Sequence, residues 1–281
     1  MFPRFRLLVL GVLAVLVACT GSPADPDRVV LRLETGPVAP VTYNEPPTLL
    51  FADGRLVTPA AVDNPVTGPA IRGFQVRQLT DEAVDEITDA AGKAGLNRSR
   101  SYPGPSGLPA TVTSTTFRFN DGEVHEVQVD NLGRYFLGEP VAWEVRDGRL
   151  KILDFHERFT HIELWLPEAA VGRAEEFEFE RMIVAAAELP AALGSPLGQP
   201  LEWPLGDLDR FGEVLVSPFQ TGPAQPSGRC GVVDGEDLAT VLETAGSARG
   251  GTPWSSNGKL YAVRFQPLLA GDAGCPAAPA P

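Results

Sequence analysis

Two of the three histidines lie in one segment with a glutamate, as His156, Glu157 and His161, and imidazole nitrogens are common zinc ligands. The metalloprotease pattern His-Glu-x-x-His places its imidazoles one helical turn apart on one face. Here the spacing is five, which rotates the second ring by about 140° on a helix. We therefore expect no metal site, with both side chains on the polar face of an amphipathic helix. His125, in an alternating strand pattern, is expected to face solvent.

Residues 175–180 contain four glutamates and two phenylalanines. Calcium needs oxygen ligands that converge from a curved loop, as in the pattern Asp-x-Asp-x-Asp-Gly. Neither this segment nor residues 234–237 reproduce that pattern, so we expect a solvated edge strand at 175–180.

Signatures of nucleophilic catalysis and of nucleotide binding are missing from the sequence. It contains no Gly-x-Ser-x-Gly, and no glycine-rich phosphate or dinucleotide loop follows a strand. The sequence therefore indicates no catalytic residue and no cofactor. Hydrolysis by carboxylates from distant positions in the chain stays open.

The N-terminal segment carries Arg4 and Arg6 and then an apolar run at 7–18. Such a run is short for a membrane-spanning helix and typical of an export signal. It ends in Leu-Val-Ala-Cys at 16–19, which resembles the lipobox of bacterial lipoproteins. The resemblance implies that the leader is cut before Cys19, that the thiol receives a diacylglycerol, and that several acyl chains form a stable anchor. A secreted protein or an uncleaved N-terminal helix are the alternatives.

Once Cys19 is assigned to lipid, Cys230 and Cys275 remain, and outside the cytoplasm they have a single possible pairing. Closing this loop would stabilise the fold by about 4 kcal/mol in the chain-entropy model. Cys230 aligns with the apolar Val76 in the internal repeat described next, which favours a structural role. Two separate free thiols are the alternative.

A helix followed by a hairpin organises the chain. Residues 79–95 have a potential N-cap at Thr80 and a potential C-terminal stop at Gly95, and their apolar residues recur at helical spacing. Residues 115–129 predict a hairpin around Asp121-Gly122, because Asp-Gly tolerates the backbone angles of a tight reversal.

This pattern returns near the C-terminus, with a helix from Asp234 and a hairpin around Asn257-Gly258. At a constant offset five positions match: Gly122 with Gly258, Val124 with Leu260, Val127 with Val263, Val129 with Phe265 and Leu132 with Leu268. Strands at 28–33 and 181–186 precede the helices at matching distances. We predict two repeats of strand, irregular hairpin, helix and hairpin, the alternative being two ordinary α+β segments that merely look alike.

Other segments complete the plan. A hairpin is predicted around Asp53-Gly54 and strands at 74–78 and 211–216. Between the repeats, Ile152, Phe155, Phe159, Ile162 and Leu166 step by 3, 4, 3 and 4, which predicts a helix, although residues 162–166 also alternate like a strand.

The predicted fold class is α+β: two similar units, each a helix packed on a small antiparallel sheet, with a linking helix between them. The expected divisions are an export signal (1–18), a lipidated tether (19–27), a first repeat (28–135), a linking segment (136–179), a second repeat (180–275) and a disordered tail (276–281).

The net charge is −13, which repels phosphate backbones and disfavours nucleic-acid binding, and the 43% hydrophobic content supports a folded body. The whole chain resembles a group of actinobacterial lipoproteins and secreted proteins of unassigned function. The resemblance rests on the lipobox, on residues 50–57 and 77–82, and on the C-terminal stretch 252–275. It implies a cell type, an extracytoplasmic location at the cell membrane, lipid on Cys19 and a Cys230–Cys275 bridge, but no activity.

We therefore expect a membrane-anchored, non-catalytic binding or accessory module of the cell envelope, with an envelope protein or ligand as its partner. A hydrolase with dispersed carboxylates is the alternative. A concave pocket that holds carboxylates with shifted pKa values would favour the enzyme.

Overall fold

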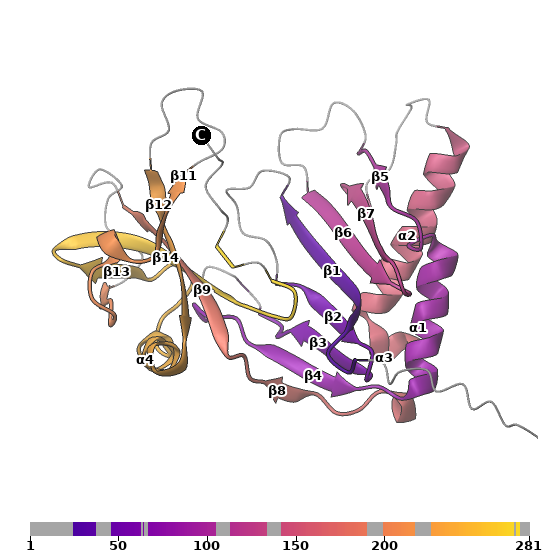
Figure 1. Ribbon diagram of the computed structural model, residues 1–281, viewed down its shortest axis with the longest axis horizontal. Helices are drawn as coiled ribbons and strands as arrows, with labels where there is room; N and C mark the ends of the chain where they lie inside the picture. The colour runs from indigo at the N-terminus through magenta and orange to yellow at the C-terminus, as the bar shows by residue number, and fades with distance from the viewer. Residues whose placement is uncertain are drawn as a thin grey trace, which may run out of the picture.

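In the computed structural model of the chain, the structure describes residues 25–37, 46–62, 64, 67–104, 113–133, 142–189, 199–216, 226–272 and 274–275. The predictions for the export signal, for Cys19 and for the tail at 276–281 lie outside the described residues. Within them the chain forms two separate β-sheets and four α-helices (Figure 1). No helix in this part of the chain is long and apolar enough to cross a membrane.

The first sheet has eight strands in the order β5-β7-β6-β1-β2-β3-β4-β8. Their bounds are β1 (Val29–Pro37), β2 (Thr48–Phe51), β3 (Arg55–Pro59), β4 (Phe74–Gln78), β5 (Arg100–Tyr102), β6 (Thr113–Asn120), β7 (Val124–Asp130) and β8 (Glu175–Phe177). The hairpins predicted at Asp53-Gly54 and Asp121-Gly122 are the β2–β3 and β6–β7 turns. β8 is an edge strand, as predicted.

The second sheet has six strands in the order β10-β13-β14-β9-β12-β11. Their bounds are β9 (Arg181–Glu188), β10 (Leu201–Glu202), β11 (Glu213–Val216), β12 (Pro226–Asp234), β13 (Pro253–Ser256) and β14 (Lys259–Pro267). Both sheets are mixed, because β5 pairs parallel with β7 and β10 pairs parallel with β13. The prediction of small antiparallel sheets was therefore wrong. These two strands are too short to show an alternating pattern.

Three helices belong to the first sheet: α1 (Asp81–Ala94), α2 (Trp143–Thr160) and the short α3 (Ile162–Trp165). The Thr80 hydroxyl caps α1 by accepting from the Ala83 amide, and Gly95 ends it with φ of 87°. The apolar stripe predicted between the repeats is buried with the apolar face of α1 in one core. The helical prediction is confirmed over the strand alternative, and the helix expected to link the units packs within the first of them. The short η1 (Glu168–Ala170) follows α3.

The second sheet carries α4 (Gly235–Ala245), whose Leu238, Val241 and Ala245 are buried. Asp234 is the N-cap residue, but its side chain accepts no capping bond. The core beneath is aromatic: the Trp254 ring lies 5.7 Å from Trp203 and 5.5 Å from Phe265. The short η2 (Leu208–Arg210) lies near the turn between β13 and β14.

The two units share a helix that follows a strand and precedes a hairpin, but their strand orders differ. In the first sheet β6, the first hairpin strand, pairs with β1. In the second sheet β14, the second hairpin strand, pairs with β9. β12 pairs directly with β9, whereas β2 and β3 separate β4 from β1. The described strands are compatible with two similar units, and duplication stays a prediction.

The C-terminal residues 268–275, here called the C-terminal strap, join the two sheets. Leu269 packs on the outer face of the first sheet among Leu49, Phe51, Val57 and Phe74. The Asp272 carboxylate pairs there with the buried Arg32 guanidinium. Cys275 then returns to the second sheet through a disulfide with Cys230 on β12, which confirms the predicted bridge.

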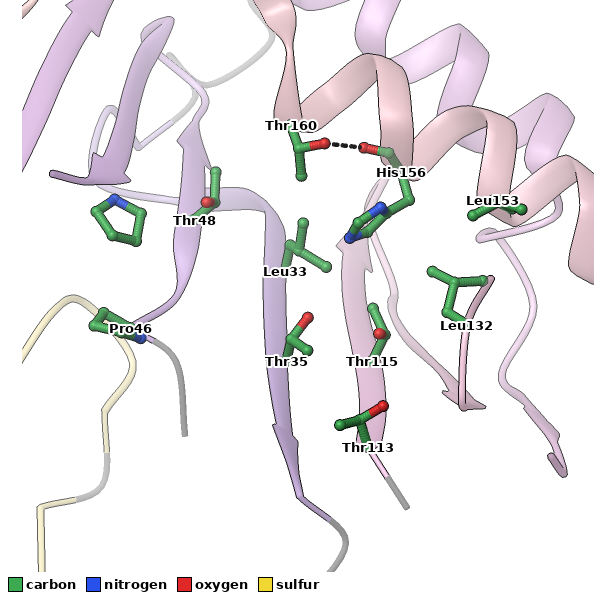
Figure 2. A pocket seen from close by; sticks show the side chains of 11 residues that line it. Leu33, Thr35, Pro46, Thr48, Thr113, Thr115, Leu132, Leu153, His156 and Thr160 are labelled. Atoms are coloured by element: carbon green, nitrogen blue, oxygen red, sulfur yellow. Dashed lines mark hydrogen bonds between the residues drawn. The ribbon is translucent and has the colours of Figure 1, made fainter. Parts of the chain in front are cut away.

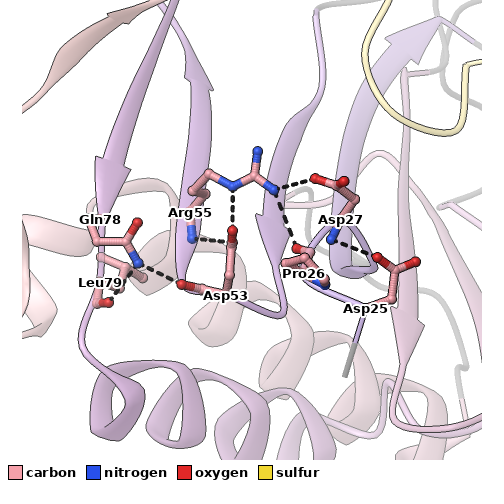
Figure 3. A network of polar contacts seen from close by, with 7 residues as sticks. All are labelled: Asp25, Pro26, Asp27, Asp53, Arg55, Gln78 and Leu79. Atoms are coloured by element: carbon pink, nitrogen blue, oxygen red, sulfur yellow. Dashed lines mark hydrogen bonds and ion pairs between the residues drawn. The ribbon is translucent and has the colours of Figure 1, made fainter. Parts of the chain in front are cut away.

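Arg55 holds the start of the described chain against the first sheet (Figure 3). Its guanidinium lies 2.6 Å from the Asp53 carboxylate, across the β2–β3 turn, and 2.6 Å from that of Asp27. The same group lies 4.6 Å from the centre of the Phe51 ring. The chain preceding β1 is thereby fixed at the end of the sheet where β1 begins.

Candidate functional site

A pocket forms where the helices stop covering the first sheet. β1 and β6 pair in register, with Leu31 opposite Phe119, Leu33 opposite Phe117 and Thr35 opposite Thr115. Alternate residues of a strand share a face. The face that begins with buried leucine and phenylalanine beneath the helices therefore continues as threonine beyond them. This change of residue type makes a hydroxyl-bearing floor.

One face of α2 supplies the wall. Leu153, His156 and Thr160 are spaced three and four apart, so they share one stripe of the helix. They face the floor across a cavity of about 340 Å³ (Figure 2). The remaining lining residues are Leu33, Thr35, Pro46, Thr48, Pro59, Thr113, Thr115 and Leu132. This volume lies within the range of small-molecule sites.

The threonine hydroxyls of the floor are free to bind a ligand. Thr160, on the wall, is committed to its own helix, where its hydroxyl donates to the His156 carbonyl at 2.8 Å. The hydroxyls of Thr35, Thr48, Thr113 and Thr115 have no hydrogen-bond partner among the described residues. Thr115 is only 4% exposed as a residue, so its hydroxyl lies at the bottom of the pocket.

His156 lies half-buried in the pocket wall. Its ring meets the Phe117 ring edge-on, with centroids 6.2 Å apart. Burial lowers its pKa below the ordinary 6.5, so the imidazole is neutral at neutral pH. The expectation of a polar-face histidine was therefore wrong for His156, because the apolar stripe of α2 is wide enough to include it. His161 is exposed, with Nδ1 lying 3.0 Å from the Glu157 carbonyl oxygen.

The pocket has the chemistry of a binding site. A hydroxyl nucleophile needs a base within hydrogen-bond reach, and no described hydrogen bond joins the His156 ring to a floor threonine. None of the lining side chains in the described part of the chain is a carboxylate, so these residues offer no pair of acids for hydrolysis. It can accommodate a small molecule and offer it hydroxyl and imidazole hydrogen bonds.

Other candidate residues are dispersed. In the described part of the chain no three His, Cys, Asp or Glu side chains come together as a metal site. His125 lies on the same face of β7 as the buried Val127, pairs with Asp121 at 3.4 Å and is only 19% exposed, so the expected solvent-facing position was wrong. Its neighbour Val124 is 67% exposed.

A polar cluster in the second sheet has a structural role. The Asp209 carboxylate accepts from Lys259 at 2.8 Å and from the Tyr261 hydroxyl at 2.7 Å. Burial, followed by this hydrogen bond, raises the pKa of Tyr261 to about 12. Bonding to Asp209 and Glu188 likewise raises the pKa of Lys259. The cluster fastens η2 to β14.

None of the residues selected as sites from the sequence lines the pocket. Cys230 and Cys275 meet at the second sheet, and Cys19 lies outside the described residues. The sequence did contain a signal for the pocket. Along residues 31–35 every second residue is Leu, Leu and Thr, and along residues 115–119 every second residue is Thr, Phe and Phe, so the two strands change from apolar to hydroxyl side chains at paired positions. Comparison with protein-family models, curated proteins and solved structures finds no match to this chain.

Proposed function

We propose that this protein is a lipid-anchored, extracytoplasmic module of a bacterial cell envelope that binds a small molecule in the threonine-lined pocket. The observation that carries this proposal is a pocket floored by threonine hydroxyls, in which none of the described lining residues is a carboxylate. This composition supports binding over the alternative of a hydrolase with dispersed acids.

The position of the pocket fits a tethered protein. Arg55 holds the chain where β1 begins, and Thr35 lies six residues beyond Val29, at the other end of that strand. At the rise of an extended strand this separates the pocket from the tether by about 20 Å. A ligand could therefore enter the pocket while Cys19 is held at the membrane surface.

The pocket is tested with matched substitutions on α2. Leu153→Trp places an indole in the cavity, whereas Leu150→Trp adds the same group at a position that is already 49% exposed. Each variant is purified from cell envelope and examined by native mass spectrometry. A bound small molecule should accompany the wild type and Leu150→Trp but not Leu153→Trp. Equal content in all three, or turnover of an envelope polymer, would contradict a binding role.

The anchor is tested at Cys19. Mass spectrometry of the mature N-terminus should find acyl chains on this residue, and Cys19→Ala should move the protein from the membrane to the soluble fraction. An unmodified N-terminus in the wild type would overturn the anchor while leaving the pocket untouched. Pull-down from intact envelope with both forms tests whether a protein partner depends on membrane attachment.

We also propose that the two units arose by duplication. The constant offset of the matched hairpins supports this, as does burial of Val127 and Val263 in their respective cores. The second strands of the two matched hairpins have different neighbours: β7 lies between β5 and β6, and β14 lies between β13 and β9. Duplication therefore requires that this strand changed its pairing partners afterwards.

A further inference from the structure

The charge of the pocket limits what it can hold. Among the described residues its lining contains no Asp, Glu, Lys or Arg, and its histidine is neutral at neutral pH. An ion that enters such a cavity gives up hydration without gaining an opposite charge, which is costly. Uncharged molecules avoid this cost.

The floor requires oxygen or nitrogen on the ligand. Thr35 and Thr115 lie directly opposite each other on neighbouring strands, so their side chains are about 5 Å apart at Cβ. Each hydroxyl can donate one hydrogen bond and accept two. Thr115 is 4% exposed as a residue and its hydroxyl has no partner among the described residues, so this hydroxyl is available to a ligand group that enters the pocket.

The rest of the lining is aliphatic. Leu33, Leu132 and Leu153 bound the cavity together with Pro46 and Pro59, and the imidazole is the one aromatic ring among the lining residues that the structure describes. Figure 2 shows the leucines on both sides of the gap between the threonines and His156. The site therefore combines a short polar floor with an apolar surround.

We propose that the pocket selects a small uncharged amphiphile, with adjacent hydroxyl or ester oxygens on the Thr35–Thr115 pair and a short aliphatic body against the leucines. This ligand class rests on the proposed binding function.

The test uses three probes that share an eight-carbon chain: 1,2-octanediol, octanoate and octylammonium. Binding to the wild-type protein is measured at neutral pH by calorimetry and by the shifts of threonine methyl resonances. The diol should bind, and both ions should bind about tenfold more weakly or worse, because neither finds a counter-charge.

Thr115→Val removes the hydroxyl and keeps the shape, and Thr35→Val is the second variant in case the first fails to fold. Each should weaken diol binding about three- to tenfold, the size of one hydrogen bond. Thr116→Val is the matched control, because Thr116 lies on the opposite face of β6 and should leave binding unchanged.

Tighter binding of either ion than of the diol would overturn this ligand class, as would folded valine variants that bind the diol normally. Absence of diol binding would also overturn it. In each case the Leu153→Trp comparison decides separately whether the pocket binds another molecule, so failure of the ligand class and failure of the binding function are distinguishable.

Discussion

Arg149 is a buried cation that holds the strand ends beside the pocket. Its guanidinium donates to the carbonyls of Tyr102 and Pro103 at the end of β5, and to those of Asp130 and Asn131 at the end of β7, at 3.0–3.3 Å. Burial lowers its pKa, yet arginine stays charged. The residue therefore ties α2 to two neighbouring chain segments.

Replacing Arg149 should strongly destabilise the fold. Arg149→Met leaves several carbonyls without donors and should lower the free energy of unfolding by about 3 kcal/mol, measured by urea denaturation. Arg146→Met removes the same charge at an exposed position of the same helix and should change stability by about 0.5 kcal/mol or less. Similar losses in both variants would show that the carbonyl contacts contribute little.

The burial of His156 predicts that the stability of the fold decreases in acid. Burial lowers the pKa of His156 in the folded state below the ordinary 6.5. At pH values between these two pKa values, the unfolded chain therefore binds more protons than the folded protein. The contribution of neutral His156 to the free energy of unfolding is fully present above pH 6.5. It is lost as the pH falls toward and through the pKa of the folded state.

His156→Gln should therefore flatten the decline in unfolding free energy as the pH falls below 6.5, measured by denaturation at several pH values. His161→Gln alters an exposed ring that contributes less than burial to the lowered pKa of His156, so it should keep most of the wild-type slope. A wild-type slope in His156→Gln would contradict the assigned burial.

At the scale of elements, two threonines of α1 allow a capping hydroxyl to be compared with one that does not cap the helix. Thr80→Ala removes a hydroxyl that accepts from the Ala83 amide and should cost about 1 kcal/mol of stability. Thr88 bonds back to the Val84 carbonyl within the same helix, so Thr88→Ala should be neutral or slightly stabilising. Chemical denaturation of both variants measures the difference, and equal effects would argue against the cap.

The helices and hairpins could be predicted because their signals are local. Gly95 ends α1, and Asn257 and Gly258 adopt the positive φ angles, 49° and 75°, that their turn needs. Strand order could not be predicted. β7 and β14 match in sequence yet have different neighbours, because pairing is decided by contacts far along the chain.

The pocket was missed for a related reason. Threonine is common on strands, so Thr35 and Thr115 carried no distinctive signal. Their significance depends on register and on α2 covering the face only in part. His156 was judged against a zinc motif, whereas its neighbours in space are Phe117 and the floor threonines.

At the scale of the whole molecule, the C-terminal strap joins the sheets. Leu269→Ala should cost about 2–3 kcal/mol and increase hydrogen exchange in β2 and β3, because the leucine covers Leu49 and Val57. Leu242→Ala truncates a leucine that is already 37% exposed and should cost about 1 kcal/mol or less. Unchanged exchange in β2 and β3 would contradict a cover provided by the strap.

The Cys230–Cys275 bond has a consequence for resistance to proteolytic cleavage. It encloses α4, β13 and β14, so a single nick in this loop, such as one by trypsin after the exposed Arg249, leaves both fragments covalently attached. The nicked chain should migrate at full mass on a gel without reductant and separate once the bond is reduced. A cut within this loop therefore need not release the C-terminal segment that joins the two sheets.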